Sequence, residues 1–369
     1  MNTWHIVTCE YPPQIGGVSD YTGLLAEKLV GTGDAVHVWA PMIESPSQLS
    51  EKLAVHPTLG RFDGPDLSAT QQAMQHVQSS PRDILVQYVP HGYGHRSMNL
   101  AFCKWIESLA KRGDRIHLMV HEPFLESGQG SWKQRLAAQV HRRMARILLR
   151  CAHRVLISIP AWERYLLPYA PPNTKFEWLP IPATLPVTEC QPTTGKLTFG
   201  HLGTYSTHMR KLLSPVFAAV LRRVPECCAL LLGRGSAEFV SELTGLDPSL
   251  SNRIEAAGLL SPADVSRALT QCSLMFQPFP DGLSSRRTSL MNALAHAIPV
   301  VSNKGHLTED LWRHSGAIFL SSPERFADDC VKILSDAATR SELALRGREL
   351  YLSTFDWPRT LATLRLSAW

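Results

Sequence analysis

A pair of glycines near the start of the chain stands where the backbone could approach a ligand closely. Gly16 and Gly17 separate the apolar run 5–8 from residues 19–29, whose apolar side chains recur at helical spacing. Glycine tolerates positive φ and close approach of N–H groups, and a helix start attracts an anion or a hydroxyl-rich group. A tight turn with Ser19 as the helix cap explains the same residues equally well. The segment therefore predicts either a ligand-binding loop or a capped turn.

A second group of suitable residue types lies at 284–289. Ser284 and Ser285 are followed by Arg286 and Arg287, and the pattern predicts a helix from there to about His296. Hydroxyl groups, N–H groups and two guanidinium groups at one helix start suit a diphosphate. The alternative interpretation is a capped helix with solvated arginines.

His121 and Glu122 form a third group. They follow directly on the apolar run 116–120, so they stand where a predicted strand ends. An isolated histidine is more often structural than functional, and we interpret His117 on the same run in that way. On these local grounds alone, a structural role is the default for His121 as well.

The elements that must position these residues follow one pattern along the whole chain. Short apolar runs alternate with helical patterns, which is typical of strand-helix-strand units on a parallel sheet. The first half has predicted strands at 5–8, 36–39, 84–88, 116–120 and 155–157. Residues 171–194 are rich in proline and threonine, which predicts a domain linker. The second half has predicted strands at 196–200, 229–233, 274–278 and 299–301, and a helix at about 212–223.

The predicted fold class is therefore α/β, with two Rossmann-like doubly wound domains that we expect to face a central cleft. A chain of 369 residues is long enough to bury two cores. Ligands bind such sheets at the carboxyl ends of the strands, beside glycine-rich turns and helix starts. All three groups of residues stand at such positions.

The composition excludes several classes of protein. The chain is 44% hydrophobic and 19% charged, and it has no apolar run of the ~18 residues that a membrane span needs. Its first residues lack a signal-peptide pattern, which predicts a soluble, cytoplasmic protein. The eight cysteines include no Cys-x-x-Cys pair, so neither a disulfide framework nor a zinc site is indicated. The net charge of +5 suits a small anionic ligand and does not call for nucleic acid.

With these positions marked, the sequence resembles the retaining glycosyltransferases of family 4, whose fold is the two-Rossmann arrangement called GT-B. The resemblance runs nearly end to end and rests on the order and spacing of several motifs. These motifs are the opening loop 10–21, the segments 86–90, 121–123, 231–235, 257–261 and 278–287, and the closing Phe355-Asp356-Trp357. The resemblance implies an N-terminal acceptor domain at 1–185, a C-terminal nucleotide-sugar donor domain at 195–350, and a tail at 351–369 that crosses back to the first domain.

The resemblance also implies roles for individual residues. His121 belongs at the reaction centre, with Glu122 in a supporting role. Acceptor contacts are implied for Gly16, Tyr21 and Tyr93. Donor contacts are implied for a larger set around the diphosphate, the sugar and the base: Gly17, Gly203, Arg210, Lys211, Gly233, Gly235, Leu259, Leu260, Asp281, Ser284, Ser285, Arg286 and Asn292.

One departure from the family pattern concerns the donor site. The family usually has two glutamates seven residues apart, one on the sugar and one on the ribose. Here Asn292 stands at the second position and Ser284 near the first, and Asp281 is the expected substitute for the sugar contact. His201 stands where an arginine is common. The departure leaves the donor open and keeps a second hypothesis, a non-catalytic nucleotide-sugar-binding protein or partner subunit.

The expected reaction is transfer of a sugar from a nucleotide-diphosphate donor to a hydroxyl acceptor, in glycan or polysaccharide biosynthesis. The resemblance implies retention of the anomeric configuration by front-face substitution, without a protein nucleophile. We expect no cofactor and no metal site, since the chain has no persuasive Asp-x-Asp motif. A nucleotide-sugar epimerase would need acid/base carboxylates that the sequence does not identify.

The expected partners are a nucleotide sugar and a glycan or lipid-linked acceptor, without nucleic acid. Residues 132–154 carry seven lysines and arginines, interleaved with apolar residues at helical spacing. A basic amphipathic helix of this kind can rest on an anionic membrane surface, which predicts peripheral contact at the inner membrane face. The alternative is a core-packed helix with a solvated face.

Overall fold

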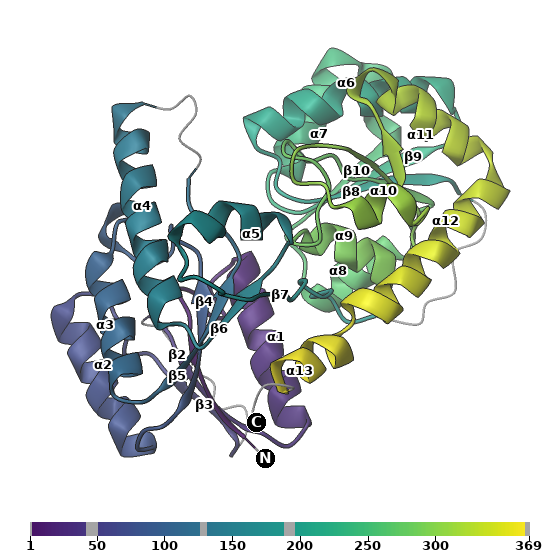
Figure 1. Cartoon of the computed structure of the whole chain (residues 1–369). Coiled ribbons are helices and arrows are strands. Elements are labelled where there is room, and N and C mark those ends of the chain that lie inside the picture. The colour runs from purple at the N-terminus through teal and green to yellow at the C-terminus, as the bar shows by residue number, and fades with distance from the viewer. Residues whose placement is uncertain (1, 42–50, 126–130, 188–195, 366–369) are drawn as a thin grey trace. The chain divides into compact units, whose positions relative to one another are not determined.

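The structure is a computed structural model in which two compact units can be distinguished (Figure 1). The first unit consists of Met1–Pro180 and Leu361–Trp369, and the second of Ile181–Thr360. The described residues are 2–41, 51–125, 131–187 and 196–365. The predicted linker 171–194 contains the boundary at 180/181, and its residues 188–194 lie outside the described ranges. Each unit has a parallel sheet with helices, which confirms the predicted α/β fold class with two Rossmann-like domains.

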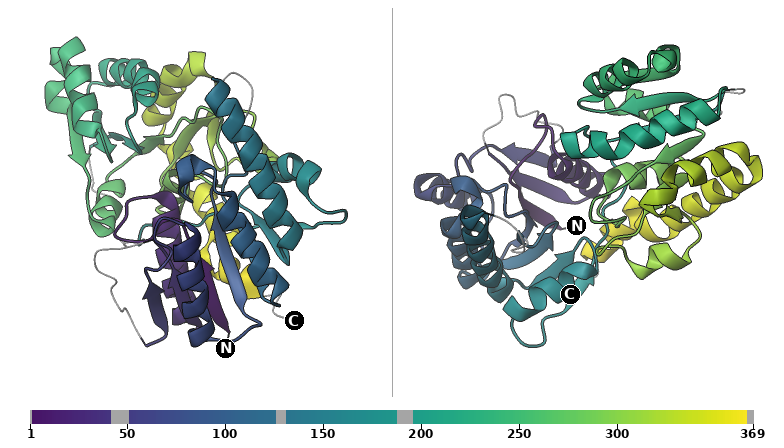
Figure 2. Two further views of the ribbon diagram at one scale, coloured as in Figure 1. Left: turned by 90° about the vertical axis from the view of Figure 1, so that its left-hand side faces the viewer. Right: turned by 90° about the horizontal axis from the view of Figure 1, so that it is seen from above.

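The first unit has a sheet whose described strands follow the order β3-β2-β1-β4-β5-β6-β7, with parallel pairing throughout. Its main elements are β1 (Thr3–Val7), α1 (Gly17–Gly31), β2 (Ala35–Trp39), β3 (Leu53–His56), α2 (Gly64–Val77), β4 (Asp83–Tyr88), α3 (Leu100–Lys111), β5 (Arg115–Val120), α4 (Trp132–Cys151), β6 (Arg154–Ile157), α5 (Ala161–Leu166), the short 3-10 helix η2 (Leu167–Tyr169) and β7 (Phe176–Trp178). Figures 1 and 2 show α2, α3 and α4 on one face of the sheet and α1 on the other. The strand order reverses between β1 and β4, and ligands bind such sheets at this switch point.

The sheet of the first unit is held by apolar packing and one buried ion pair. Ile6 and Val38 are fully buried, because helices cover both faces of a parallel sheet. Arg82 and Asp114, at the starts of β4 and β5, lie 2.6 Å apart with both side chains fully buried. Removing one partner of such a pair costs about 3–5 kcal/mol.

The last helix, α13 (Trp357–Arg365), ends in the first unit. Arg154 on β6 donates from Nη1 to the carbonyl of Leu364 (3.2 Å) and from Nη2 to that of Thr363 (3.0 Å). Arg365 pairs with Asp34 at 2.8 Å. The end of the chain is thus tied to residues of the first unit.

The second unit has a sheet whose described strands follow the order β10-β9-β8-β11-β12-β13, again parallel. Its main elements are β8 (Thr198–Leu202), α6 (Thr207–Arg223), β9 (Cys228–Leu232), α7 (Ser236–Leu246), β10 (Ile254–Gly258), α8 (Pro262–Leu269), β11 (Leu274–Phe276), α9 (Thr288–Ala295), β12 (Val300–Asn303), α10 (Asp310–His314), β13 (Phe319–Ser321), α11 (Phe326–Ser335) and α12 (Ala337–Leu350). Helices α6 and α11 pack on each other. Phe217 of α6 contacts Phe199 on β8, and Phe326 of α11 contacts Phe276 on β11. The switch point lies between β8 and β11.

Two predicted helix boundaries are wrong. The helix expected to open at 284 begins at Thr288, because Arg287 has the extended backbone of a residue that precedes a helix. The basic helix expected at 132–154 ends at Cys151, and Arg154 lies buried on β6, where it pairs with Glu177. The serines and arginines of 284–287 are therefore loop residues, and Arg154 is no part of a basic helical face.

Candidate functional site

Polar side chains of the first unit gather where its central strands end. Gln87 lies at the end of β4, His121 directly follows β5, and Ser158 directly follows β6. These strands are neighbours in the sheet, so their carboxyl ends bring the three residues to one edge.

Contacts to the ring and to the backbone carbonyl hold His121 in one orientation. Its Nε2 lies 2.7 Å from Oε1 of Gln87, and its carbonyl accepts hydrogen bonds from Nε1 of Trp162 (2.9 Å) and Oγ of Ser158 (3.1 Å). The ring of Tyr21 meets the imidazole edge-on at 5.3 Å. Because an amide oxygen only accepts, this arrangement places the proton on Nε2 and leaves Nδ1 as an acceptor.

Burial decides the charge of His121. It lowers the pKa of the imidazole to about 3, so the ring is neutral at physiological pH. Glu122, the next residue, is partly exposed. The first unit therefore offers a fixed, uncharged histidine at the end of a strand.

The start of α1 is already occupied by an anion of the protein itself. Oε1 of Glu10 accepts hydrogen bonds from the amides of Val18 (3.0 Å) and Ser19 (2.9 Å). A Cβ atom at Gly16 would lie 2.1 Å from the same oxygen, whereas one at Gly17 would meet no atom within 4 Å. The anion preference expected of this helix start is thus satisfied by Glu10, and Gly16 makes room for its carboxylate.

The two tyrosines implied as acceptor contacts are buried. Tyr93 is inaccessible; its hydroxyl donates to the carbonyl of Gln87 and its ring stacks on Phe102 at 3.9 Å between centroids. Tyr21 is also buried and packs on His121. Both therefore support the pair His121 and Gln87, and acceptor contact by Gly16, Tyr21 and Tyr93 stays a prediction.

In the second unit, three glycines interlock the turns that follow neighbouring strands. The amide of Gly203 donates to the carbonyl of Leu232 (3.0 Å), and that of Gly233 to the carbonyl of Gly258 (2.9 Å). Gly233 has φ of +113°, and a Cβ there would lie 2.2 Å from the carbonyl oxygen of Gly203. Gly235, with φ of +85°, precedes α7 as its cap. Only glycine allows this approach of the turns after β8 and β9.

An exposed apolar pair follows β10. Leu259 and Leu260, which come directly after Gly258, are 63% and 40% exposed. Gly258 lies against the Gly233 turn through the hydrogen bond just described. The pair implied as a base contact is thus accessible at the carboxyl edge of the sheet.

The loop after β11 gathers two guanidinium groups and one hydroxyl group around two carboxylates. Arg286 and Arg287 both pair with Asp281. Ser285 donates from both its amide (2.9 Å) and its hydroxyl to Oε1 of Glu309, in the segment between β12 and α10. The two arginines expected to bind a diphosphate therefore converge on one point, where their positive charges are met by a carboxylate of the same chain.

The two carboxylates differ in their pKa shifts. Burial alone raises the pKa of Asp281, but the charges of Arg287 and Arg286 outweigh it and hold the pKa below its usual range. Burial raises the pKa of Glu309, against the hydrogen bonds from Ser285 and Trp312. Asp281 is thus a charged counter-ion, whereas Glu309 is a half-buried acceptor that fixes the loop.

The remaining side chains expected at the donor site are those of Arg210, Lys211 and Asn292. Arg210 on α6 pairs with Glu242 on α7, and Lys211 beside it is exposed. Oδ1 of Asn292, on α9, accepts hydrogen bonds from the amides of Thr184 (2.8 Å) and Leu185 (3.1 Å). The structure thus brings Asp281, Ser285 and Arg286 together, and it commits Asn292 to the segment that precedes β8.

Several buried polar atoms beside these loops have no hydrogen-bond partner among the described residues. They include Nδ1 of His201 on β8, Nε2 of Gln277 directly after β11, and Oγ of Ser284. Burial lowers the pKa of His201 to about 3, so this ring is neutral too. Buried polar groups are normally satisfied, so each of these atoms retains the capacity for a partner that the described residues do not supply.

Sequence reasoning missed Gln87, Gln277 and Glu309. Glu309 lies 24 residues beyond the serine that it holds, and no local motif signals this pairing. Gln87 could have been found, since it lies in a predicted strand within a motif of the resemblance. In the described ranges, no cluster of three or more His, Cys, Asp or Glu side chains is arranged to hold a metal ion. None of the helices described there has the length and apolar character to cross a membrane.

Comparison with known proteins gives structural matches only. No protein-family model matches the sequence, and no curated protein matches it. Sucrose-phosphate synthase from Thermosynechococcus elongatus has a TM-score of 0.76 at 16% identity, over 99% of this chain and 98% of that one. Anabaena HepE in complex with UDP and glucose has a TM-score of 0.70 at 15% identity, over 100% and 99%. WaaG, a glycosyltransferase involved in lipopolysaccharide biosynthesis, has a TM-score of 0.69 at 12% identity, over 99% and 100%.

At these identities the likeness shows the fold alone. That fold is the two-Rossmann GT-B arrangement, as the resemblance implied. Because one fold hosts many functions, the activity has to be argued from the two strand-end sites.

Proposed function

We propose that the protein is a glycosyltransferase that moves a sugar from a nucleotide-diphosphate donor to a hydroxyl group of a glycan or lipid-linked acceptor. The observation that carries the proposal is the arginine pair of the second unit, beside buried polar atoms without partners. The fold shared with HepE, which was solved with UDP and glucose, supports it. Such an activity belongs in glycan or polysaccharide biosynthesis.

The donor's diphosphate takes the place of Asp281 as the partner of the arginines. Arg286 and Arg287 already converge on one carboxylate, so their positions suit a second anion with more oxygens. As the sugar bond breaks, negative charge grows on the departing diphosphate, and fixed guanidinium groups stabilise it. The exposed Lys211 adds positive charge near the first turn of α6. This stabilisation requires no metal ion.

The base and the sugar take the remaining positions of the donor site. Leu259 and Leu260 offer an exposed apolar surface for the base, next to the Gly233 turn. Asp281, once released from the arginines, can accept a hydrogen bond from a sugar hydroxyl. Asn292 contributes indirectly, because it holds Thr184 and Leu185.

His121 acts on the transferred sugar as a neutral hydrogen-bonding group. Gln87 holds its Nε2, and Nδ1 faces no donor among the described residues, so Nδ1 can accept from a sugar hydroxyl. We assign it no nucleophilic role. The anomeric configuration is retained by front-face substitution, in which an oxygen of the departing phosphate accepts the acceptor's proton.

Helix α4 provides peripheral contact with an anionic membrane surface. Trp132 and Leu136 near its start are 67% and 50% exposed, beside the exposed Lys133 and Arg135. Aromatic and basic side chains together favour the headgroup region. This contact would bring the protein to a lipid-linked acceptor at the inner membrane face.

The test is a turnover assay without metal. The purified chain is incubated with UDP-, GDP-, ADP- and TDP-sugars in a chelator, with and without oligosaccharide acceptors, and the products are followed by NMR. We expect sugar nucleotides with one particular base to raise the unfolding temperature of the protein selectively. Nucleoside diphosphate should form only when an acceptor is present, and the sugar in the product should retain the anomeric configuration of the donor. Binding without turnover would instead indicate a non-catalytic nucleotide-sugar-binding protein, and a changed sugar without acceptor an epimerase.

A further inference from the structure

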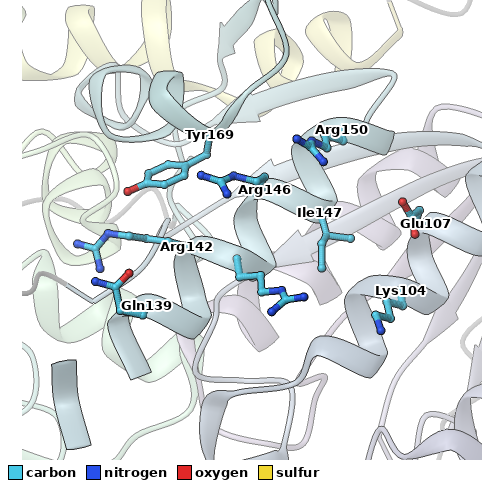
Figure 3. Close-up of a pocket in the computed structure, with 9 residues that line it drawn as sticks. Lys104, Glu107, Gln139, Arg142, Arg146, Ile147, Arg150 and Tyr169 are labelled. Carbon is cyan, nitrogen blue, oxygen red and sulfur yellow. The ribbon is translucent and has the colours of Figure 1, made fainter. Parts of the chain in front are cut away.

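The first unit has a second polar hollow, on the side of its sheet that carries α3 and α4. It lies between α3, α4 and η2 and has a volume of about 740 Å³. Figure 3 shows Arg142, Arg146 and Arg150 along α4, Lys104 and Glu107 on α3, and Tyr169 at one end. The residues of this hollow, which we call the α3–α4 pocket, are distinct from those around His121.

Positive charge dominates the α3–α4 pocket. Five cationic side chains line it, the fifth being Arg143, against the single carboxylate of Glu107. Glu107 pairs with Lys111 at 3.3 Å, so this carboxylate already has a partner that does not line the pocket. In the described part of the chain, no carboxylate forms an ion pair with Lys104, Arg143, Arg146 or Arg150. This contrasts with the arginines of the second unit, which have a carboxylate of their own.

The arginines are crowded by their spacing along the helix. Arg142, Arg146 and Arg150 follow one another at four-residue intervals, which makes them neighbours on the surface of α4. Like charges at this spacing repel each other. A bound anion would relieve this repulsion.

Aromatic rings hold two of the guanidinium groups in place. Arg146 lies over the ring of Tyr169 at 5.4 Å, and Arg142 over that of Phe124 at 4.7 Å. The inner face of α4, with Met144 and Leu148, is buried, so the helix cannot turn its arginines away. The charges are therefore positioned before any ligand arrives, which lowers the entropy cost of binding.

We propose that the α3–α4 pocket binds a phosphate monoester or diphosphate group. Guanidinium groups match the oxygens of phosphate in pairs, and several of them around one hollow favour a multiply charged anion over a single carboxylate. The proposal does not depend on the proposed function, because the pocket shares no residue with the donor site. The group could belong to a soluble compound or to a lipid headgroup.

The test compares two variants that remove charge inside and outside the pocket. Calorimetry measures binding of inorganic pyrophosphate to the intact protein, to the double variant Arg143→Gln/Arg146→Gln and to the control Arg112→Gln. Arg112 is an exposed residue of the first unit that does not line the pocket, and it lies outside α4 and its proposed membrane contact. We expect the double variant to weaken one class of binding site by at least about tenfold, since charge-assisted contacts are lost. The control should stay within about twofold of the original.

A second arm identifies the source of the phosphate. Phosphatidylcholine vesicles with and without phosphatidic acid, whose headgroup is a phosphate monoester, are sedimented with the same three proteins. Pyrophosphate binding that only the double variant loses supports a soluble ligand, and vesicle binding that only the double variant loses supports a lipid headgroup. Equal losses in the double variant and in Arg112→Gln, or no loss in either arm, would overturn the proposal. The Arg286→Ala variant should keep the pocket's affinity, which separates this site from the donor site.

Discussion

The strand-end sites of the two units have the same architecture and opposite electrostatics. In the first unit, a neutral histidine is held by the amide of Gln87, and a resident carboxylate, Glu10, occupies the helix start. In the second unit, two arginines share Asp281. The first site is therefore suited to hydroxyl groups, and the second to an anion that can displace a carboxylate.

This difference indicates that the point where the strand order reverses determines where a ligand binds, but not which kind of ligand binds there. Both units reverse their strand order at such a point, and both place loops and helix starts there. What distinguishes them is which charges the loops carry and which groups already pair with those charges. The two units also differ in how many histidines have a lowered pKa, and the first prediction rests on this difference.

Acidification should produce the largest difference in stability between the two units. Burial lowers the pKa of His5 to about 4, and burial with the nearby His37 lowers that of His56 to about 4. In the unfolded chain these rings have a pKa near ~6.5. Between these values the unfolded state binds more protons, so the free energy of unfolding of the first unit falls as the pH drops from about 6.5 to about 4.

The measurement is hydrogen exchange of each unit at neutral pH and near pH 4.5. The second unit has fewer such histidines, His201 and His296, so its protection should outlast that of the first. The His56→Gln variant should flatten the pH dependence of the first unit. Loss of protection in the second unit first would contradict the comparison.

Replacement of His121 by alanine should act on turnover rather than on donor affinity. Loss of the neutral hydrogen-bonding group should lower kcat by about a hundredfold, with the dissociation constant of the nucleoside diphosphate unchanged. The conservative His121→Asn variant, which can still bond to Gln87, serves as the folding control. An equal change in both quantities would move His121 out of the reaction centre.

Opposite changes within the arginine site should have opposite effects. Arg286→Ala should weaken binding of the nucleoside diphosphate by about tenfold or more, since a charge-assisted contact is worth ~1.5–3 kcal/mol. Asp281→Asn should strengthen it by about two- to fivefold, because the arginines lose a partly exposed competing partner. Calorimetry with the free nucleoside diphosphate excludes any sugar contact. If Asp281→Asn also weakened binding, the proposal that the diphosphate replaces the Asp281 carboxylate as partner of the arginines would be wrong.

The smallest expected effect concerns Glu10. Glu10→Gln removes a charge from the start of α1 and should cost about 1 kcal/mol of stability, with a fall of about 2–4 °C in unfolding temperature. Donor affinity should not change, since Glu10 belongs to the first unit. Differential scanning calorimetry at neutral pH checks the first expectation, and a shifted donor affinity would argue against separate sites.

The elements that could be predicted from the sequence are those with a periodic pattern. The strands later described as β1, β2, β4, β5 and β6 stand within about two residues of their predicted places, because a buried parallel strand is a run of apolar side chains. The edge strands β3, β7, β10 and β13 were missed, because they are short and partly exposed. The type of the fold followed from the central strands alone.

The contacts within the sites could not be predicted, because they join residues far apart in the chain. Nothing near Ser285 indicates that Glu309 will hold it, and nothing near Val18 indicates that Glu10 will reach the helix start. The arginine pair was visible as a motif, but its pairing with Asp281 depends on a loop conformation. Spacing along a sequence reveals residue types at strand ends, and only the fold reveals which charges are already neutralised.

The attachment of α13 bears on the order in which the protein can fold during synthesis. Arg154 is buried, and in addition to its ion pair with Glu177 its guanidinium group donates to the carbonyls of Thr363 and Leu364. Domains generally fold as they leave the ribosome, beginning with the N-terminal one. Here the first unit remains incomplete until residues 361–365 have been made, so during synthesis of the entire second unit Arg154 has its carboxylate partner but lacks these two hydrogen bonds. Chaperone capture of stalled chains would therefore be expected at the N-terminal unit.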